Sequence, residues 1–391
     1  MRKVVITSAK RTPVGSFNGA LSSFTAAQLG SIAIKAVLEE TKINVNLIDE
    51  VIMGNVLTAG QGQAPARQAA IFAGLPEKTE CLTINKMCGS GLKAVMLAQQ
   101  AIANGDAEII IAGGQESMTN TPYLLPKARA GYRLGNGEII DSLIKDGLWD
   151  VYNDIHMGSC AEVCAREFSF KREELDEFAV SSYRKALSAI KEGKFKDEIV
   201  KVPVKTKSGE TFVVDDEEPG RVVFEKIPKL NPVLNKNGVV PAANASSIND
   251  GAAALLVMSE EKAKELGFVP LVEIVAQSSA AKAPIEFTTA PADAIAKVLK
   301  KAELKKEEID LFEINEAFAV VSLAVNKILG LDNSKVNVNG GAVAIGHPIG
   351  ASGARILVTL IHEMKKRNSK YGLASLCIGG GEASALIVKK P

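Results

Sequence analysis

One short glycine-rich segment near the C-terminal end of the chain carries a single histidine. Five glycines and His347 lie between Val336 and Arg355, in the run VNVNGGAVAIGHPIGASGAR. Such glycine density indicates tight turns or close approaches of the backbone, and Pro348 biases His347 toward an extended or turn conformation. The apolar run 354–361 predicts a buried helix, whose positive end would face the segment. A glycine-rich turn with an incidental histidine is the alternative.

A cysteine stands in a similar setting in the first half of the chain. Cys88 lies in the run TINKMCGSGL, directly before a helix predicted over 92–103. At a helix N-terminus a thiol is expected to have a lowered pKa and more of the nucleophilic thiolate form. The alternative is a buried structural cysteine.

Two further polar residues follow predicted strands. Cys377 precedes Ile378 and three glycines, whose backbone N–H groups suit an oxyanion. Without metal-type spacing, Cys377 suggests an acid/base role near Cys88, and disulfide-forming redox chemistry is the competing idea. Asn315, in the run NEAF, could orient a water or donate a hydrogen bond, or it could merely cap the next helix.

Composition narrows the class of protein. The 391 residues are 47% hydrophobic, enough for two or more domains, and 46 Lys and Arg balance 45 Asp and Glu. This balance and the 5% aromatic content argue against a nucleic-acid partner. No apolar stretch approaches a membrane span, and the strand-like start at Val4 leaves no room for a signal peptide. Five scattered cysteines favour free thiols in a reducing, cytoplasmic location.

Apolar strands alternate with amphipathic helices, which predicts an α/β fold. In the first half the expected strands are 4–7, 51–53 and 109–111, the last closed by the glycine-containing segment 112–116. Residues 118–244 are richer in charge and turn signals, and we interpret them as an inserted region. The predicted domains are therefore a first core of residues 1–117 and 245–270, the insertion 118–244, and a second core of residues 271–391.

The pattern of the first half returns in the second. The segment 36–51 matches 297–312, the segment 111–117 is echoed by 378–384, and 88–91 falls opposite 350–353. Three echoes in the same order at nearly one offset indicate a duplicated α/β domain. A cleft between related halves is a natural site, across which Cys88 and His347 would approach each other.

Four motifs together resemble the thiolase family, and the resemblance runs along essentially the whole chain. They are CGSG at Cys88, NEAF at Asn315, GHPIGASGAR at His347 and CIGGGEAS at Cys377. The resemblance implies two duplicated α/β cores with mixed five-stranded sheets, plus an inserted loop domain that binds coenzyme A and helps build a homotetramer. It further implies a short-chain acyltransferase that joins two acetyl-CoA into acetoacetyl-CoA and CoA, reversibly, as part of fatty acid metabolism.

The resemblance also implies a role for each motif residue. Cys88 would accept the acetyl group, with His347 assisting its deprotonation. Cys377 would take a proton from the methyl group of the second acetyl-CoA, or return it in the cleavage direction. One oxyanion hole would be His347 with a water held by Asn315, and the other the backbone N–H groups of Cys88 and Gly379.

No prosthetic group is implied, only coenzyme A as part of the substrate. By resemblance, Arg221 and Lys226 would face its nucleotide end, and Ser246 with His156 its pantetheine arm. Solvated loop charge is the alternative for Arg221 and Lys226. The other residues implied at this site are Met157, Tyr183, Leu148, Ala317, Phe318 and Phe287.

Two departures from the commonest bacterial pattern resemble the potassium-activated, mitochondrial-type members, which accept a 2-methyl-branched substrate. Phe287 lies in FTTAP, where many relatives carry a Met-Gly-x-Gly-Pro loop, and PAANAS at 241–246 accompanies Tyr183. Ordinary loop packing is the alternative. The implied potassium ligands are Tyr183 and the backbone oxygens of Ala242, Ala243, Ala245 and Val343.

Three other functions compete with this interpretation. A degradative 3-ketoacyl-CoA thiolase would need a deep apolar tunnel for longer chains. A non-catalytic acyl-binding relative would not need all four catalytic positions filled. A redox protein that pairs Cys88 with Cys377 would leave His347 and Asn315 unexplained.

Overall fold

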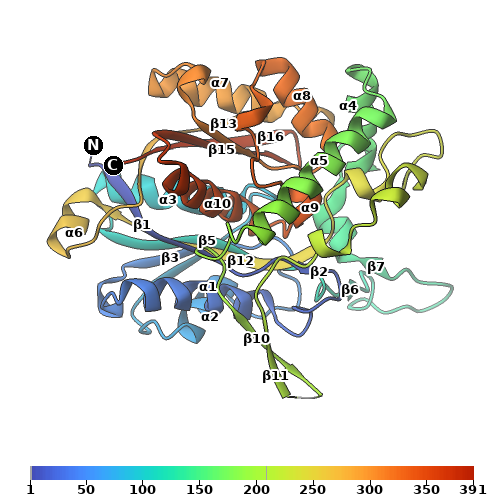
Figure 1. Ribbon diagram of the computed structural model, residues 1–391. Coiled ribbons are helices and arrows are strands. Elements are labelled where there is room, and N and C mark those ends of the chain that lie inside the picture. Colours follow the sequence, from blue (N-terminus) through green and yellow to red (C-terminus); the bar gives the residue numbers. More distant parts are fainter. Residues whose placement is uncertain (1, 208) are drawn as a thin grey trace.

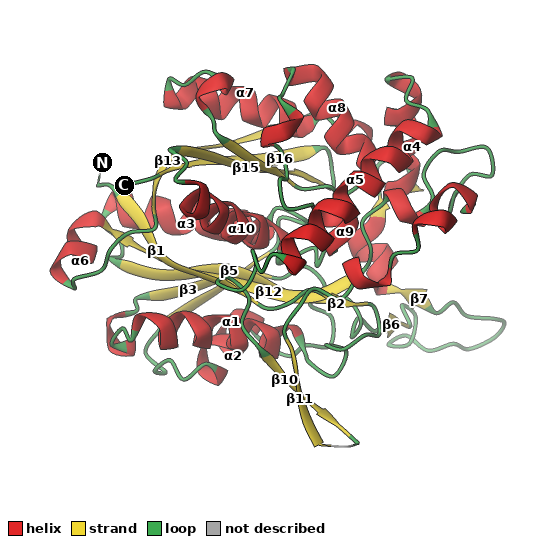
Figure 2. Cartoon of the chain, in the orientation of Figure 1, coloured by secondary structure: helices red, strands yellow, loops and turns green. Residues whose placement is uncertain are grey.

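The computed structural model describes residues 2–207 and 209–391, and its helices and strands form five alternating layers (Figures 1 and 2). Helices α1 (Ala26–Thr41) and α2 (Pro65–Phe72) form one outer layer, and α7 (Ala290–Ala302) and α8 (Ala319–Leu329) form the other. Helices α3 (Ser90–Asn104) and α10 (Ser352–Arg367) form the central layer, between the two parts of the sheet. The short helices α6 (Glu260–Glu265) and α9 (Ala342–Ile345) complete the two cores.

The first part of the sheet has the strand order β4-β3-β5-β12-β1. These strands are β1 (Val4–Arg11), β3 (Glu50–Gly54), β4 (Glu80–Ile84), β5 (Ile109–Ser117) and β12 (Asn249–Ser259). Strand β3 pairs in parallel with β4 and β5, whereas β12 is antiparallel to β5 and β1. The two-residue strand β2 (Gly15–Ser16) adds to the end of β12.

The second part repeats this topology in the order β14-β15-β16-β13. Its strands are β13 (Val272–Ala281), β14 (Leu311–Ile314), β15 (Tyr371–Ile378) and β16 (Glu382–Lys389). Strand β14 is parallel to β15, and β16 is antiparallel to β15 and β13. Only two residue pairs, Val5–Glu273 and Ile6–Val272, join β1 to β13 and so connect the two parts.

Matching carboxylates mark the start of β5 and β15. Asp49 accepts hydrogen bonds from the backbone N–H groups of Glu108 and Ile109, and Asp310 accepts them from the equivalent pair at 370–371. The duplicated α/β fold predicted from the sequence echoes is thus confirmed. Five strands in each half are not found: within the described residues, the place of β4 in the second half is taken by a single parallel bridge between Phe312 and Val336.

The glycine-containing segment 112–116 continues strand β5, so the prediction that this strand is closed after Ile111 is wrong. Strand β5 runs on to Ser117, through Gly113 and Gly114. A Cβ atom on Gly113 would lie 2.0 Å from the Ala253 carbonyl oxygen, and one on Gly114 would lie 2.1 Å from that of Gly350. Glycine therefore serves here to let a buried strand pack closely on its neighbours.

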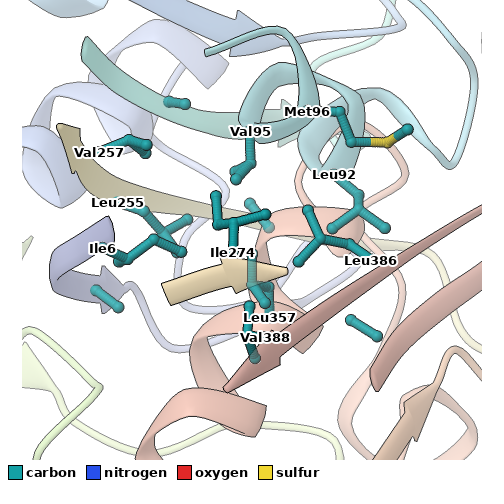
Figure 3. Packing of buried hydrophobic residues seen from close by; sticks show 14 of the residues in the cluster. Ile6, Leu92, Val95, Met96, Leu255, Val257, Ile274, Leu357, Leu386 and Val388 are labelled. Atoms are coloured by element: carbon teal, nitrogen blue, oxygen red, sulfur yellow. The ribbon is translucent and has the colours of Figure 1, made fainter. Parts of the chain in front are cut away.

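Apolar side chains pack the central helices into the core, and α10 is more completely buried than α3. Figure 3 shows Leu92 of α3 and Leu357 of α10 packed together with Ile274 of β13. At their N-terminal ends the two helices nearly touch: a Cβ atom on Gly91 would lie 2.7 Å from the Ala354 nitrogen, and one on Gly353 would lie 2.4 Å from the Leu92 nitrogen. The residues that precede the two helices are therefore brought close together.

Residues between β5 and β12 add no strand to the main sheet, within the part of the chain that the structure describes. They form helices α4 (Met157–Glu167) and α5 (Arg172–Lys191) and three small hairpins. The hairpins pair β6 (Tyr123–Leu124) with β7 (Ile140–Asp141), β8 (Trp149–Asp150) with β9 (Ile155–His156), and β10 (Val202–Thr206) with β11 (Gly209–Val213). The domain boundaries at residues 117, 245 and 271 stay a prediction. No helix of the described residues is both long and apolar enough to cross a membrane.

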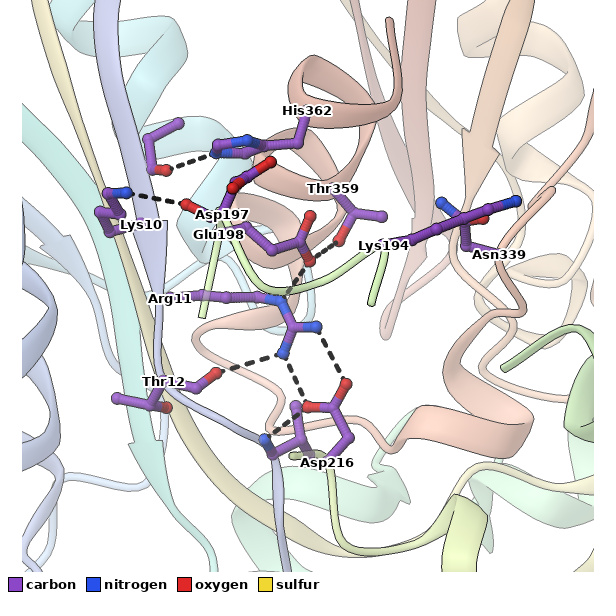
Figure 4. A network of polar contacts seen from close by, with 12 residues as sticks. Lys10, Arg11, Thr12, Lys194, Asp197, Glu198, Asp216, Asn339, Thr359 and His362 are labelled. Carbon is purple, nitrogen blue, oxygen red and sulfur yellow. Dashed lines mark hydrogen bonds and ion pairs between the residues drawn. The ribbon is translucent and has the colours of Figure 1, made fainter. Parts of the chain in front are cut away.

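A buried ionic network fastens this inserted segment to both cores (Figure 4). The guanidinium of Arg11, at the end of β1, donates to Glu198 at 2.6 Å and to the two carboxylate oxygens of Asp216 at 2.7 and 2.9 Å. Thr359 of α10 also donates to Glu198, at 2.9 Å. Because each buried charge is paired, the network fixes the insertion without leaving an isolated ion.

Candidate active site

A cavity of about 650 Å³ opens where the N-terminal ends of α3 and α10 meet. Its wall includes Cys88, two residues before α3, and His347, five residues before α10. Gly379, which follows β15, lines the same cavity. The structure thus brings a thiol, an imidazole and a backbone N–H group from both halves to one place.

The Cys88 loop is a tight turn closed by Ser90, the first residue of α3. The Ser90 hydroxyl donates to the Met87 carbonyl at 2.6 Å and accepts from the Lys86 N–H at 2.8 Å. Met87 has a φ of 45°, a left-handed conformation that is costly for a residue with a side chain. The turn holds the sulfur of Cys88 toward the cavity, where the backbone N–H of Gly379 donates to it.

The predicted lowering of the Cys88 pKa is wrong. Burial of the thiol raises its pKa to about 11, although the hydrogen bond from Gly379 acts in the opposite direction. The negative charge of Glu116 raises it further. Desolvation is the largest of these causes, so the pKa rises even though Cys88 lies only two residues before the start of α3. Cys88 is therefore a neutral thiol at rest and needs a base at the moment of reaction.

His347 has a neutral imidazole whose Nδ1 atom is held by Ser352. Burial, with the charge of Arg355 as a smaller cause, lowers its pKa to about 3. Its Nδ1 lies 2.6 Å from the Ser352 hydroxyl, which itself donates to the Pro348 carbonyl at 2.9 Å. Because that carbonyl can only accept, Nδ1 carries the proton and donates to Ser352. Nε2 has no hydrogen-bond partner among the described residues, which leaves its lone pair available as a base.

Cys377 and Asn315 lie just behind this pair. The Cys377 thiol is fully buried in β15, and burial together with the nearby Cys88 raises its pKa well above the usual value. Asn315 directly follows β14, and its amide nitrogen lies 3.4 Å from Nδ1 of His347. The Asn315 side-chain oxygen has no hydrogen-bond partner in the described part of the chain. It is therefore a free acceptor beside the imidazole.

Apolar side chains form most of the cavity wall. Phe287 and Phe318 meet edge to face, with ring centroids 6.3 Å apart, and Met157 lies in the same hydrophobic cluster as Phe287. Of the residues predicted for coenzyme A, those that line the cavity are Leu148, His156, Met157, Arg221, Ser246, Phe287, Ala317 and Phe318. The arrangement suits a long, largely apolar arm that ends at the Cys88 sulfur.

Comparison with known proteins identifies the family of the chain. The thiolase N-terminal domain matches residues 4–261 and the thiolase C-terminal domain residues 268–390. The acetyl-CoA acetyltransferase of Cupriavidus necator is 54% identical, with all of both chains covered. The probable acetyl-CoA acetyltransferase of Escherichia coli is 52% identical over the same full coverage. The chain belongs to the thiolase family.

Two solved thiolases share the whole architecture. Human mitochondrial 3-ketoacyl-CoA thiolase superposes with a TM-score of 0.96 at 41% identity, covering 100% of this chain and 99% of that one. A thiolase from Ascaris suum, solved in complex with coenzyme A, has a TM-score of 0.94 at 44% identity, with both chains fully covered. The thiolase fold predicted from the motifs is therefore confirmed.

Some predicted site residues lie away from the thiolase cavity. Lys226 is exposed on a short 3-10 helix and does not line it, whereas Arg221 stands at its mouth with 58% of its side chain exposed. Tyr183 lies on α5, which packs against both the Ala242–Asn244 turn and α9. Burial and the charges of Glu218 and Glu316 raise the pKa of Tyr183 to about 12.

The segments proposed for potassium thus lie against one helix. Ala242 and Ala245 line the cavity; Ala243 shares their turn, and Val343 belongs to α9. Helix α5, which carries Tyr183, packs against both the Ala242–Asn244 turn and α9. The carboxylates of Glu218 and Glu316 place negative charge near the Tyr183 hydroxyl, and oxygen donors are the ligands that hard cations take.

Sequence reasoning missed four residues that form hydrogen bonds with His347 or with its loop. Ser352 contacts its ring, and the side-chain oxygen of Asn249 accepts its backbone N–H at 2.8 Å. Glu116 and Glu316 bind the same loop on either side. A signal existed for the two glutamates, because each belongs to a motif singled out in the sequence, but their partners are distant in the chain.

Proposed function

We propose that the protein is an acetyl-CoA C-acetyltransferase. It condenses two acetyl-CoA into acetoacetyl-CoA and CoA and catalyses the reverse thiolysis. The observation that carries the proposal is that a neutral Cys88 thiol and a neutral His347 imidazole line the same largely apolar cavity. The names of the Cupriavidus and Escherichia relatives support the same activity.

In the thiolysis direction, the sulfur of Cys88 attacks the 3-keto carbon of acetoacetyl-CoA. The Cys88 proton passes to Nε2 of His347, whose lone pair is free. The backbone N–H groups of Cys88 and Gly379, and His347 with a water held by Asn315, are the proposed donors to the two oxyanions. Such fixed donors lower the barrier because they need no reorganisation when charge develops.

Cleavage of the bond between C2 and C3 then releases the enolate of acetyl-CoA. The Cys377 thiol gives this carbon its proton, a role that suits a thiol whose pKa is raised. An incoming CoA thiol passes its proton to the Cys377 thiolate and attacks acetyl-Cys88. The departing Cys88 sulfur recovers its proton from His347, which returns all three groups to their resting state. Condensation is the same path in reverse.

A thiolysis assay tests this function. With CoA as the second substrate, kcat/KM for acetoacetyl-CoA is expected to exceed that for a 3-ketoacyl-CoA of eight or more carbons by at least about tenfold, since Phe287 and Phe318 limit the acyl pocket. A preference for the longer substrate would instead indicate a degradative 3-ketoacyl-CoA thiolase. No turnover of either would indicate an acyl-binding protein.

We further propose that potassium binds beside this site and that Phe287 shapes a pocket for a 2-methyl group. Tyr183 and the backbone oxygens of Ala242, Ala243, Ala245 and Val343 would hold the ion, which would order the loops around the cavity. Replacing KCl with NaCl at constant ionic strength should therefore raise KM about two- to tenfold and change kcat less.

The matching measurement compares acetoacetyl-CoA with 2-methylacetoacetyl-CoA in both salts. Equal rates in KCl and NaCl would remove the potassium site. Failure to cleave the methylated substrate would remove the role of Phe287. Assembly into a homotetramer through residues 118–244 and a part in fatty acid metabolism are proposals that rest on the family resemblance, and sedimentation would test the first. A cytoplasmic location is a separate proposal, which rests on the five scattered cysteines.

A further inference from the structure

We propose that Glu116 and Glu316 are positioning residues that hold the His347 loop at its two ends and so set the direction of the imidazole. The inference deepens the proposed acetyltransferase function and rests on it. The loop in question runs from Gly341 to Gly350. Neither carboxylate lines the cavity, so neither is a catalytic residue in the sense of touching substrate.

Glu116 holds the C-terminal end of the loop. Its fully buried carboxylate accepts the backbone N–H of Gly350, three residues after His347, at 2.9 Å. It also accepts the N–H groups of Val56 and Leu57 and the side-chain amide of Asn55, at 2.7 to 3.2 Å. Both oxygens therefore receive a backbone donor and one further donor. One side chain thus fastens the first-half loop 55–57 to the second-half catalytic loop.

Glu316 holds the other end. Its carboxylate accepts the backbone N–H of Val343 at 3.2 Å, the Ser182 hydroxyl at 2.6 Å and the Asn337 amide at 2.9 Å. Ser182 in turn accepts the backbone N–H of Gly341 at 3.0 Å. The first turn of the loop is thus tied to α5 and to the segment that follows α8.

Each tie meets a glycine of the loop. A Cβ atom on Gly350 would lie 2.6 Å from the Glu116 carboxylate, and one on Gly341 would lie 2.2 Å from the carboxyl carbon of Glu316. Between them, Gly346 has a φ of 111° and would place a Cβ atom 2.5 Å from Asn249, the residue that accepts the His347 N–H. Three polar side chains therefore approach the backbone of this loop so closely that only glycine fits, which explains these three glycines of the segment.

Burying two carboxylates lowers the stability of the folded state, which argues that Glu116 and Glu316 do more than fill space in the core. Burial raises the pKa of Glu116 to about 7 and also raises the pKa of Glu316. A pair of buried carboxylates destabilises a core unless donors surround it, and apolar residues of the same volume would stabilise the fold at least as well. Most of the groups that donate hydrogen bonds to these two carboxylates belong to loops beside the cavity. The unfavourable burial of the carboxylates therefore comes with a fixed geometry of those loops.

The decisive variants are Glu116→Gln and Glu316→Gln, which keep size and remove one acceptor. In Glu116→Gln, the new NH₂ group faces a backbone N–H in either orientation of the amide, so two donors meet and one hydrogen bond is lost. In the second, it faces either Val343 N–H or Asn337, whose amide is already fixed by two hydrogen bonds to Ile314. We expect kcat for thiolysis to fall roughly ten- to hundredfold with KM changed less than about twofold, because misplacing a catalytic group by about 1 Å has effects of that size.

A second readout needs no turnover. Alkylation of Cys88 by iodoacetamide, followed by peptide mapping, should slow at least about fivefold in both variants, because His347 no longer faces the thiol. In Glu116→Gln the lost negative charge lowers the pKa of Cys88, but that charge is the smallest cause of the shift, so the loss of the base is expected to dominate. Asp310→Asn is the matched control: its carboxylate also accepts two backbone N–H groups, but at the far end of β15. Its kcat and its alkylation rate should stay within about twofold of the wild type.

Different results would contradict the positioning role and the proposed function. Folded Gln variants with wild-type kcat and wild-type alkylation, or with a raised KM alone, would overturn the inference. If either variant fails to fold, Ser182→Ala, which removes the tie to Gly341, should still lower kcat several-fold. A wild type without thiolysis would count against the proposed function only, since slowed alkylation in the variants would still support the positioning role.

Discussion

Replacing Cys88 with alanine is expected to lower acyl transfer by at least about 10⁴-fold while the fold stays intact. The sulfur is the atom to which the acetyl group would be bonded, and no other thiol among the described residues lines the cavity. Exchange of one small, half-buried side chain for another should cost less than about 1 kcal/mol of unfolding free energy. Thiolysis of acetoacetyl-CoA and a thermal melt measure the two effects.

The control for this variant is Cys81→Ala, which removes a half-buried thiol of β4 outside the cavity. It should retain wild-type turnover. Radiolabelled acetyl-CoA provides the sharper check, because the label should remain on one peptide, the one that contains Cys88. Finding the acetyl group on any other residue would contradict the assignment of the nucleophile.

Loss of Cys377 is expected to block condensation and yet permit acetylation of Cys88. The proposed role of Cys377 is proton transfer to and from carbon, which occurs only after the acetyl group is in place. Cys377→Ala should therefore lower condensation by at least about 10³-fold, with acetyl labelling of Cys88 reduced much less. The two half-reactions are followed separately with labelled acetyl-CoA.

Cys164→Ala is the matched buried thiol, since Cys164 is also buried and does not line the cavity. Both substitutions leave a similar small void, so their thermal stabilities should fall by similar amounts. Only Cys377→Ala should affect condensation. A Cys377→Ala protein that cannot be acetylated at all would mean that the roles of the two cysteines are misassigned.

The fold and the meeting of the Cys88 and His347 loops could be predicted because both depend on local sequence patterns. The echo of segment 36–51 in 297–312 indicated the duplication, and the equivalent places of Cys88 and Gly350 implied that loops from both halves meet. Aligned repeats and helix starts depend on neighbouring residues, which a single sequence displays.

What could not be predicted depends on contacts between distant segments. Gly113 and Gly114 suggest that the strand has ended, but they lie within β5 and pack closely against Ala253 and Gly350. The pKa of Cys88 follows from how many atoms surround the sulfur, which outweighs its place near a helix start. The tie between Glu116 and Gly350 joins residues 234 positions apart, and no local pattern records it.

The near-contact of Gly91 and Gly353 has a consequence for how the two halves can diverge. These residues occupy the same place in each copy of the duplicated domain, and each leaves only a hydrogen atom facing the other helix. A methyl group on either would force α3 and α10 apart and carry the nucleophile away from its base. The two copies are thus free to acquire different chemistry in the loops ahead of their helices, a cysteine in one and a histidine in the other. At this crossing both positions require glycine, and so the distance between the two loops is set by the same close packing in each half.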